Sequence, residues 1–269
     1  MDYGAYPERS NWKKKYELAI PIILLILVIG VLAWQMGWLD FVPGIGERRV
    51  MDVLIVGEDD PLRHQLEEEV GGLNLNVIDM ERAREIEDPA FLEHFDLIIL
   101  TEELGEQPGD IPSTFRSHIS ERLGKGTDLI LYGLAGTTDP AEPQTDGWTQ
   151  HDMNKYIPVD CSGSGVCTVE KEGYPGDMLS MAIMQKDHPI IREFGPSYDF
   201  PEYLTNITYA PMNTRSGSEV ITQIKVEDPV GKTDPGIVET SWVGGRAIYF
   251  AYHPVETPTI LKNTIDYLR

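Results

Sequence analysis

Cysteine and basic residues are scarce in this sequence, and the short motifs of several common enzyme classes are missing. The 269 residues include two cysteines and 22 Lys or Arg, against 44 Asp or Glu. The sequence contains no Gly-rich phosphate loop, no His-Glu-x-x-His and no paired Cys-x-x-Cys. No segment is repeated along the chain. The sequence therefore gives no motif support for a P-loop nucleotide-binding protein, a zinc protease of the HExxH type or a repeat protein.

The shortage of basic residues is confined to the chain after residue 50. Residues 1–50 hold six Lys or Arg and five Asp or Glu, whereas residues 51–269 hold 16 and 39, a formal charge of −23. Such a surface repels nucleic acid and anionic lipid head groups. We therefore expect no nucleic-acid partner. Solubility is the simplest explanation of the charge, and adaptation to high salt or to a cation-rich cell surface is the alternative.

One long hydrophobic run lies near the N-terminus. Residues 18–39 (LAIPIILLILVIGVLAWQMGWL) are 22 residues without a charge, enough for a helix to cross a hydrocarbon core of roughly 30 Å. Trp12, Tyr16, Trp34 and Trp38 flank the run as an aromatic belt would. A cleaved signal peptide is the alternative, but the run is longer than a signal sequence needs and lacks an A-x-A cleavage pattern. We predict a transmembrane helix that contacts membrane lipid.

The flanking charges predict the orientation of this helix. Four Lys or Arg precede it and two follow it, which favours a cytoplasmic N-terminus and an extracytoplasmic C-terminal domain at the cell membrane. The sequon at Asn206 fits an exterior domain as a candidate glycosylation site. Cys161 and Cys167 are predicted to form a short-loop disulfide, with two free thiols or half of a metal site as alternatives.

Residues 51–269 alternate apolar runs of strand length with amphipathic segments, the pattern of a parallel sheet covered by helices. We expect strands at residues 51–57, 74–80, 96–101, 128–132, 207–212 and 220–226, and a hairpin of residues 237–242 and 246–252. Helices are expected at residues 61–70, 90–94, 112–123 and 258–268, the first capped by Asp59 or Asp60. The predicted organisation is an N-terminal tail (1–17), the transmembrane helix (18–39), a linker (40–50) and an α/β domain (51–269). An insertion at about residues 137–176 interrupts that domain, because this stretch is too long for an ordinary connection.

Four short segments of this domain carry a family resemblance. They are residues 126–136 (GTDLILYGLAG), Trp148 followed by 156–160 (YIPVD), 187–194 (DHPIIREF) and 244–254 (GGRAIYFAYHP). Together they resemble the class I glutamine amidotransferase-like domains, especially the noncatalytic versions of bacterial and archaeal membrane proteins. The resemblance implies a flavodoxin-like three-layer sandwich with a mainly parallel sheet. The opening VLIVGEDDPL is similar to a response-regulator receiver as well, but Thr101 stands where the phosphorylated Asp is expected.

The resemblance also implies where catalytic residues would lie. The family uses a Cys nucleophile on a tight turn after a strand, a His base and an orienting acid. Here the turn is Gly133, Leu134 and Gly136, so the nucleophile position holds Leu134. His253 matches the base, and Glu256, one residue beyond the family's spacing, is the approximate acid. A structural histidine donating to a backbone carbonyl is the other interpretation of His253.

Acidic residues follow the predicted strands, where parallel sheets bind their ligands. Glu58 and Glu102 are candidates for ligand binding, together with the Gly133–Gly136 turn. Helix capping and a solvated acidic rim explain the same residues. The sequence thus predicts a noncatalytic binding or scaffolding module of the cell envelope, without a cofactor, whose partner is a protein or a polymer. The alternative is a metal-dependent hydrolase using His253 and the acidic strand ends.

Overall fold

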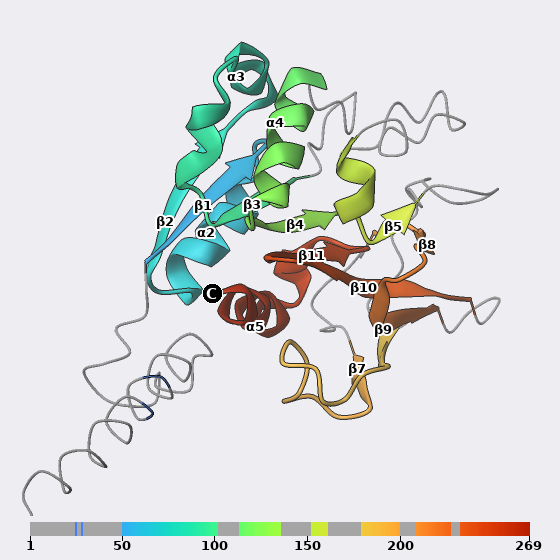
Figure 1. The fold of residues 1–269 in the computed structure, drawn as a ribbon. Helices are drawn as coiled ribbons and strands as arrows, with labels where there is room; N and C mark the ends of the chain where they lie inside the picture. The colour runs from blue at the N-terminus through green and yellow to red at the C-terminus, as the bar shows by residue number, and fades with distance from the viewer. Residues whose placement is uncertain are drawn as a thin grey trace, which may run out of the picture. The chain divides into compact units, whose positions relative to one another are not determined.

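The structure is a computed structural model that describes most of the domain after residue 49. It describes residues 50–101, 113–135, 152–160, 179–199, 208–226 and 232–269, together with Leu25 and Val28. Val50–Arg269 form one compact unit. Figure 1 shows its helices packed on both sides of one large sheet.

The first half of the sheet is parallel. Its strands are β2 (Leu73–Ile78), β1 (Met51–Val56), β3 (Leu97–Leu100), β4 (Asp128–Tyr132) and β11 (Gly245–Phe250), in that spatial order. Neighbouring strands in this half pair in parallel throughout. The order 2-1-3-4-5 is that of flavodoxin-like domains. The expected α/β sandwich with a flavodoxin-like sheet is therefore confirmed.

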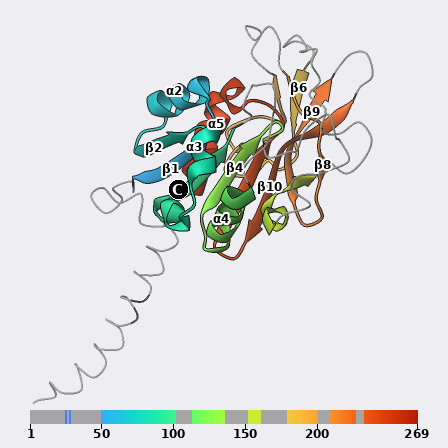
Figure 2. The same cartoon turned by 90° about the horizontal axis from the view of Figure 1, so that it is seen from above.

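The second half of the sheet is antiparallel, so the expectation of a mainly parallel sheet is wrong. Strands β10 (Thr233–Trp242), β9 (Glu219–Val226), β6 (Leu179–Ile183) and β7 (Ser197–Asp199) continue from β11, giving nine strands in all among the described residues. Every pairing from β11 outward is antiparallel. The predicted hairpin accounts for the first of these pairings, since a two-residue connection between Trp242 and Gly245 can only join antiparallel strands. Figure 2 shows the sheet continuing through β10 to β9 and β6.

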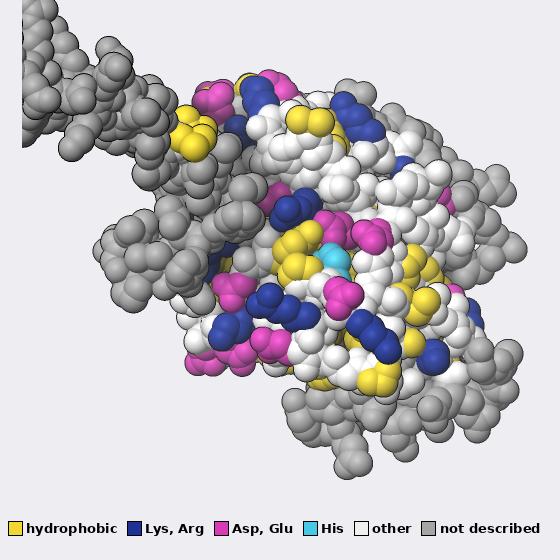
Figure 3. Space-filling model, turned by 60° about the horizontal axis from the view of Figure 1, so that its bottom comes forward, with side chains coloured by type: hydrophobic (Ala, Val, Ile, Leu, Met, Phe, Trp, Pro, Cys, Tyr) yellow, Lys and Arg dark blue, Asp and Glu magenta, His cyan; other side chains and the backbone are white. Residues whose placement is uncertain are grey.

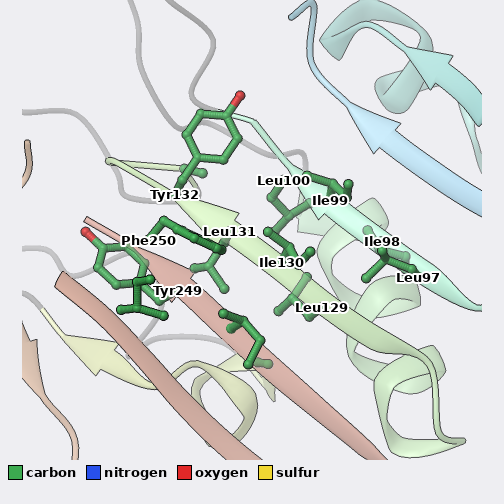
Figure 4. Packing of buried hydrophobic residues seen from close by; sticks show 14 of the residues in the cluster. Leu97, Ile98, Ile99, Leu100, Leu129, Ile130, Leu131, Tyr132, Tyr249 and Phe250 are labelled. Carbon is green, nitrogen blue, oxygen red and sulfur yellow. The ribbon is translucent and has the colours of Figure 1, made fainter. Parts of the chain in front are cut away.

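Two helical layers cover the parallel half. Helices α2 (Asp60–Glu69) and α5 (Pro258–Leu268) contact one another on one face. The short α3 (Met80–Glu85), the 3-10 helix η1 (Pro89–His94) and α4 (Ser113–Gly124) form the layer on the opposite face. Between the layers every residue of β3 is buried (Figure 4), because a central parallel strand has no face in water.

Several short elements of the structure were not predicted from the sequence. A two-stranded sheet pairs β5 (Val159–Asp160) with β8 (Asn213–Thr214), and 3-10 helices lie at Asp152–Tyr156 (η2) and Pro254–Glu256 (η4). The strand expected at residues 207–212 is wrong: Tyr209 forms only an isolated bridge to Tyr252 before Pro211, which cannot donate to a ladder. Within the predicted insertion, only residues 152–160 are described.

Most of the predicted transmembrane segment lies outside the described residues. Leu25 and Val28, the two residues of it that the structure describes, are both helical. No helix within the described part of the chain is long and apolar enough to cross a membrane. The membrane anchor therefore stays a prediction.

The turn after β1 depends on a glycine. Gly57 has a φ of +106°, and a Cβ at this position would overlap the Oγ1 atom of Thr101, which itself donates to the carbonyl of Val56 at 2.9 Å. We predict that Gly57→Ala lowers the free energy of unfolding by about 3 kcal/mol, since it adds backbone strain to a steric overlap. Urea unfolding followed by circular dichroism measures the change. Gly71→Ala is the matched control, because no atom lies within 4 Å of a Cβ there; an equal loss in both variants would contradict the argument.

Candidate functional site

Three polar side chains meet at the carboxyl edge of the parallel strands. Asp59 follows β1, Tyr132 ends β4, and His253 follows β11. The Oδ2 atom of Asp59 accepts a hydrogen bond from the Tyr132 hydroxyl and lies 2.8 Å from Nε2 of His253. In Figure 4 the Tyr132 hydroxyl points away from the hydrophobic side chains below it. The cluster joins residues 194 positions apart in the sequence.

Asp59 is in place because it also caps α2. Its Oδ1 atom accepts the backbone N–H of Leu62 at 2.9 Å, and Pro61 occupies the first turn, as the sequence predicted. Only 4 % of the Asp59 side chain is exposed, so its second oxygen needs partners within the protein. His253 and Tyr132 supply them.

The local backbone fixes the tautomer of His253. The backbone N–H of Val255 donates to Nδ1 at 3.4 Å, so Nδ1 is the acceptor and Nε2 carries the proton donated to Asp59. Pro254 lies between them and has no N–H of its own. Both ring nitrogens are therefore engaged, and the histidine donates to a carboxylate rather than to a backbone carbonyl.

The carboxylate of Asp59 is kept ionised by its partners. Burial on its own would raise the pKa of Asp59, but the hydrogen bonds from His253, Tyr132 and Leu62 lower it below the ordinary value. Glu256 behaves differently, because burial raises its pKa. The structure thus pairs His253 with Asp59, across the sheet, instead of with Glu256 three residues along the chain.

The turn after β4 has no reactive side chain. Gly133 adopts a φ of +56°, its N–H donates to the carbonyl of Phe250 at 3.0 Å, and its carbonyl accepts the Tyr249 hydroxyl at 3.1 Å. Leu134 is 1 % exposed and belongs to the hydrophobic core. The residue to which the family resemblance assigns the nucleophile position is therefore a buried aliphatic group. Gly136 lies outside the described residues.

The remaining candidate residues do not join this cluster. Glu58 is exposed and lines a hollow of about 450 Å³ that Asp59 also lines, together with Asp60, Arg63 and Val77. Glu102, Cys161, Cys167 and Asn206 lie outside the described residues. Within the described ranges, no three of His, Cys, Asp and Glu converge as a metal ion requires. These ranges consequently provide no metal site for the hydrolase alternative.

A second histidine–carboxylate pair, not predicted from the sequence, lies elsewhere on the sheet. His188 Nε2 is 2.7 Å from Oε2 of the buried Glu239, and the backbone N–H of Ile190 donates to His188 Nδ1 at 3.4 Å. Its Nε2–H therefore donates to a carboxylate, as in His253. In both cases the histidine precedes a proline. This His-Pro dipeptide is present in two of the four family-like segments, and it was the sequence feature from which the second pair could have been suspected. It does not indicate which carboxylate is the partner.

Comparison with known proteins adds evidence on the fold. No protein-family model matches the chain, and no curated protein matches it. Among solved structures, a cytoplasmic protein of Salmonella typhimurium LT2 superposes with a TM-score of 0.57 at 14 % identity, covering 81 % of this chain and all of that one. A ThuA-like protein of Bacteroides uniformis gives a TM-score of 0.55 at 13 % identity, over 82 % and 92 % of the two chains.

A β-galactosidase of Bacillus circulans is similar over part of its length. The TM-score is 0.54 at 13 % identity, and the match covers 83 % of this chain but 31 % of the enzyme. At these identities the likeness shows a shared flavodoxin-like fold, which can support many functions.

The Asp59 cluster predicts a pH-dependent stability. Because the pKa of Asp59 is lowered in the folded protein, its contribution is complete above the unfolded value of about 4 and is lost as the pH falls through the folded pKa. We expect Asp59→Asn to lower the free energy of unfolding by about 2 kcal/mol at pH 7 and by progressively less towards pH 3. Urea denaturation across this range measures it. Asp60→Asn, in the same turn but exposed, is the control; a deficit in Asp59→Asn that does not shrink in acid would contradict the assignment.

Proposed function

We propose that this chain is a noncatalytic, membrane-tethered binding or scaffolding module with a glutamine amidotransferase-like domain. The observation that carries the proposal is the state of His253, whose two ring nitrogens are both used within the protein. Acyl transfer requires a nucleophile and a base that can take its proton. Here Leu134 supplies no nucleophile, and His253 presents no free nitrogen to receive a proton.

The cluster of Asp59, Tyr132 and His253 is present although Leu134 supplies no nucleophile. This combination supports a structural role for the three residues. Asp59 connects the N-terminus of α2 with the ends of β4 and β11. A scaffold stabilised in this way keeps a rigid surface for a partner while the catalytic reaction is lost. The partner we infer is a protein or a polymer of the cell envelope.

The location is inferred from the sequence before residue 50. The uncharged 22-residue run and the excess of Lys and Arg before it support an anchor with the domain outside the cytoplasm. Acidic and basic side chains are interspersed on the face shown in Figure 3, with apolar side chains in small groups. Such a surface suits a domain that is surrounded by water and held at the membrane by its N-terminal segment.

The catalytic half of the proposal is tested by restoring the missing nucleophile. We expect the purified full chain to release no ammonia from glutamine above the rate of buffer alone, and Leu134→Cys to remain equally inactive because His253 stays paired with Asp59. A coupled glutamate dehydrogenase assay measures ammonia, and circular dichroism verifies folding of the variant. Turnover by the unmodified chain that is abolished in His253→Ala would refute a noncatalytic role.

The topological half is tested with reporters fused after Arg269. We expect alkaline phosphatase, which matures only outside the cytoplasm, to be active, and green fluorescent protein, exported unfolded, to be dark. Deleting residues 18–39 should reverse both signals and release the protein from carbonate-washed membranes. Fluorescence from the full-length fusion would place the domain on the cytoplasmic side and overturn this part.

A further inference from the structure

A polar hollow lined by His188 and Glu239, the second histidine–carboxylate pair, lies at the amino edge of β4 and β11, opposite the His253 cluster. Its volume is about 670 Å³, within the range of small-molecule sites. It is lined by the first residue of β4, the start of β9, the end of β10, the start of β11 and the last turn of α5, together with His188, Gly217 and Gly244 from the connections. Most of the lining residues therefore belong to regular elements.

The base of this pocket is a fixed polar network. Glu239 accepts from His188 through Oε2 and from the Tyr267 hydroxyl through Oε1, at 2.7 and 3.1 Å. The guanidinium of Arg246 stacks 4.4 Å above the Tyr267 ring, and its Nη1 donates to the Tyr267 carbonyl at 3.2 Å. Side chains held in this way lose little conformational entropy when a ligand arrives.

The charges in the pocket select against anionic ligands. Asp128, Glu219 and Glu239 repel an anion, as does the net charge of the domain. Arg246 offsets part of this negative charge, and its Nε atom lies 3.8 Å from Oε1 of Glu239. Burial raises the pKa of Asp128 to about 6, although the backbone N–H and the charge of Arg246 oppose the shift.

Hydroxyl groups and an indole ring also line the opening. Thr240 and Ser241 add hydroxyl groups beside the carboxylates and Arg246. Trp242 contributes a half-buried ring, fixed by the indole N–H that donates to the Leu123 carbonyl at 2.9 Å. Gly245 leaves room for this ring, since a Cβ there would approach it to 2.8 Å. A ligand with many hydroxyl groups and an apolar C–H face matches such a lining.

We propose that this pocket binds a neutral polyhydroxylated ligand, a saccharide unit, between Trp242 and the hydrogen-bonding groups of Asp128, Glu239 and Arg246. The site would give the proposed envelope module a polymer to recognise. Its geometry is independent of the membrane anchor and of the missing nucleophile, so it can be tested apart from them.

The test uses the full chain in a detergent without a sugar head group, so that the detergent cannot occupy the pocket. Maltose, cellobiose and N,N′-diacetylchitobiose are titrated with calorimetry, with spermidine and glucose 6-phosphate as charged comparisons. We expect at least one neutral disaccharide to bind with one-to-one stoichiometry, and neither charged compound to compete with it.

Two substitutions locate the binding. Ser241→Tyr places a large side chain at the exposed rim and should weaken disaccharide binding at least tenfold without touching the buried network. Val243→Tyr is the matched control, because Val243 lies at the tip of the same hairpin, 96 % exposed and outside the pocket; its affinity should be unchanged. Failure of all three disaccharides to bind, binding of spermidine alone, or binding that Ser241→Tyr leaves intact would each overturn the proposal.

Discussion

The buried carboxylate of Asp59 determines how the carboxyl edge of the parallel strands is arranged. Asp59 is almost completely removed from water, and an ionised group in that position is stable only with hydrogen-bond partners. Leu62, Tyr132 and His253 meet that requirement, and each belongs to a different element. The same hydrogen bonds that stabilise the carboxylate therefore also fix the orientation of the His253 ring.

The His188–Glu239 pair shows that the same local arrangement occurs a second time in the described residues. A histidine before a proline can accept an N–H two residues on, because the proline between them has none to compete. The proton is then on the outer nitrogen, which seeks an acceptor. Glu239 fills this role for His188, as Asp59 does for His253. Helix α5 begins just after His253-Pro254 and, near its end, contributes Tyr267 to the His188–Glu239 pair, so both ends of the helix adjoin a histidine–carboxylate pair.

The predictions made from the sequence are confirmed where short-range interactions determine the structure. The apolar runs located β1, β3 and β4, and the cap at Asp59 with Pro61 located α2. Contacts between distant residues were not predicted. Glu256 was expected to be the acidic partner of His253 because of its spacing, whereas the observed partner, Asp59, is 194 positions away. The number of antiparallel pairings in the sheet was underestimated for a related reason. The hairpin was recognised, but the pairing of β9 with β6 depends on residues separated by about 40 positions and leaves no short-range pattern.

The antiparallel extension also explains why the two edges of the sheet differ. In parallel sheets, ligands usually bind at the carboxyl ends of the strands, and here Asp59, Tyr132 and His253 at that edge are hydrogen-bonded to one another. Strand β10 runs the opposite way, so its final residues arrive at the amino edge beside the start of β4. It brings Glu239, Thr240 and Trp242 to a place where a purely parallel sheet would present only the beginnings of strands. A polar pocket at the amino edge is thus a direct consequence of reversing one strand, and it lies at the opposite edge of the sheet from the Asp59 cluster.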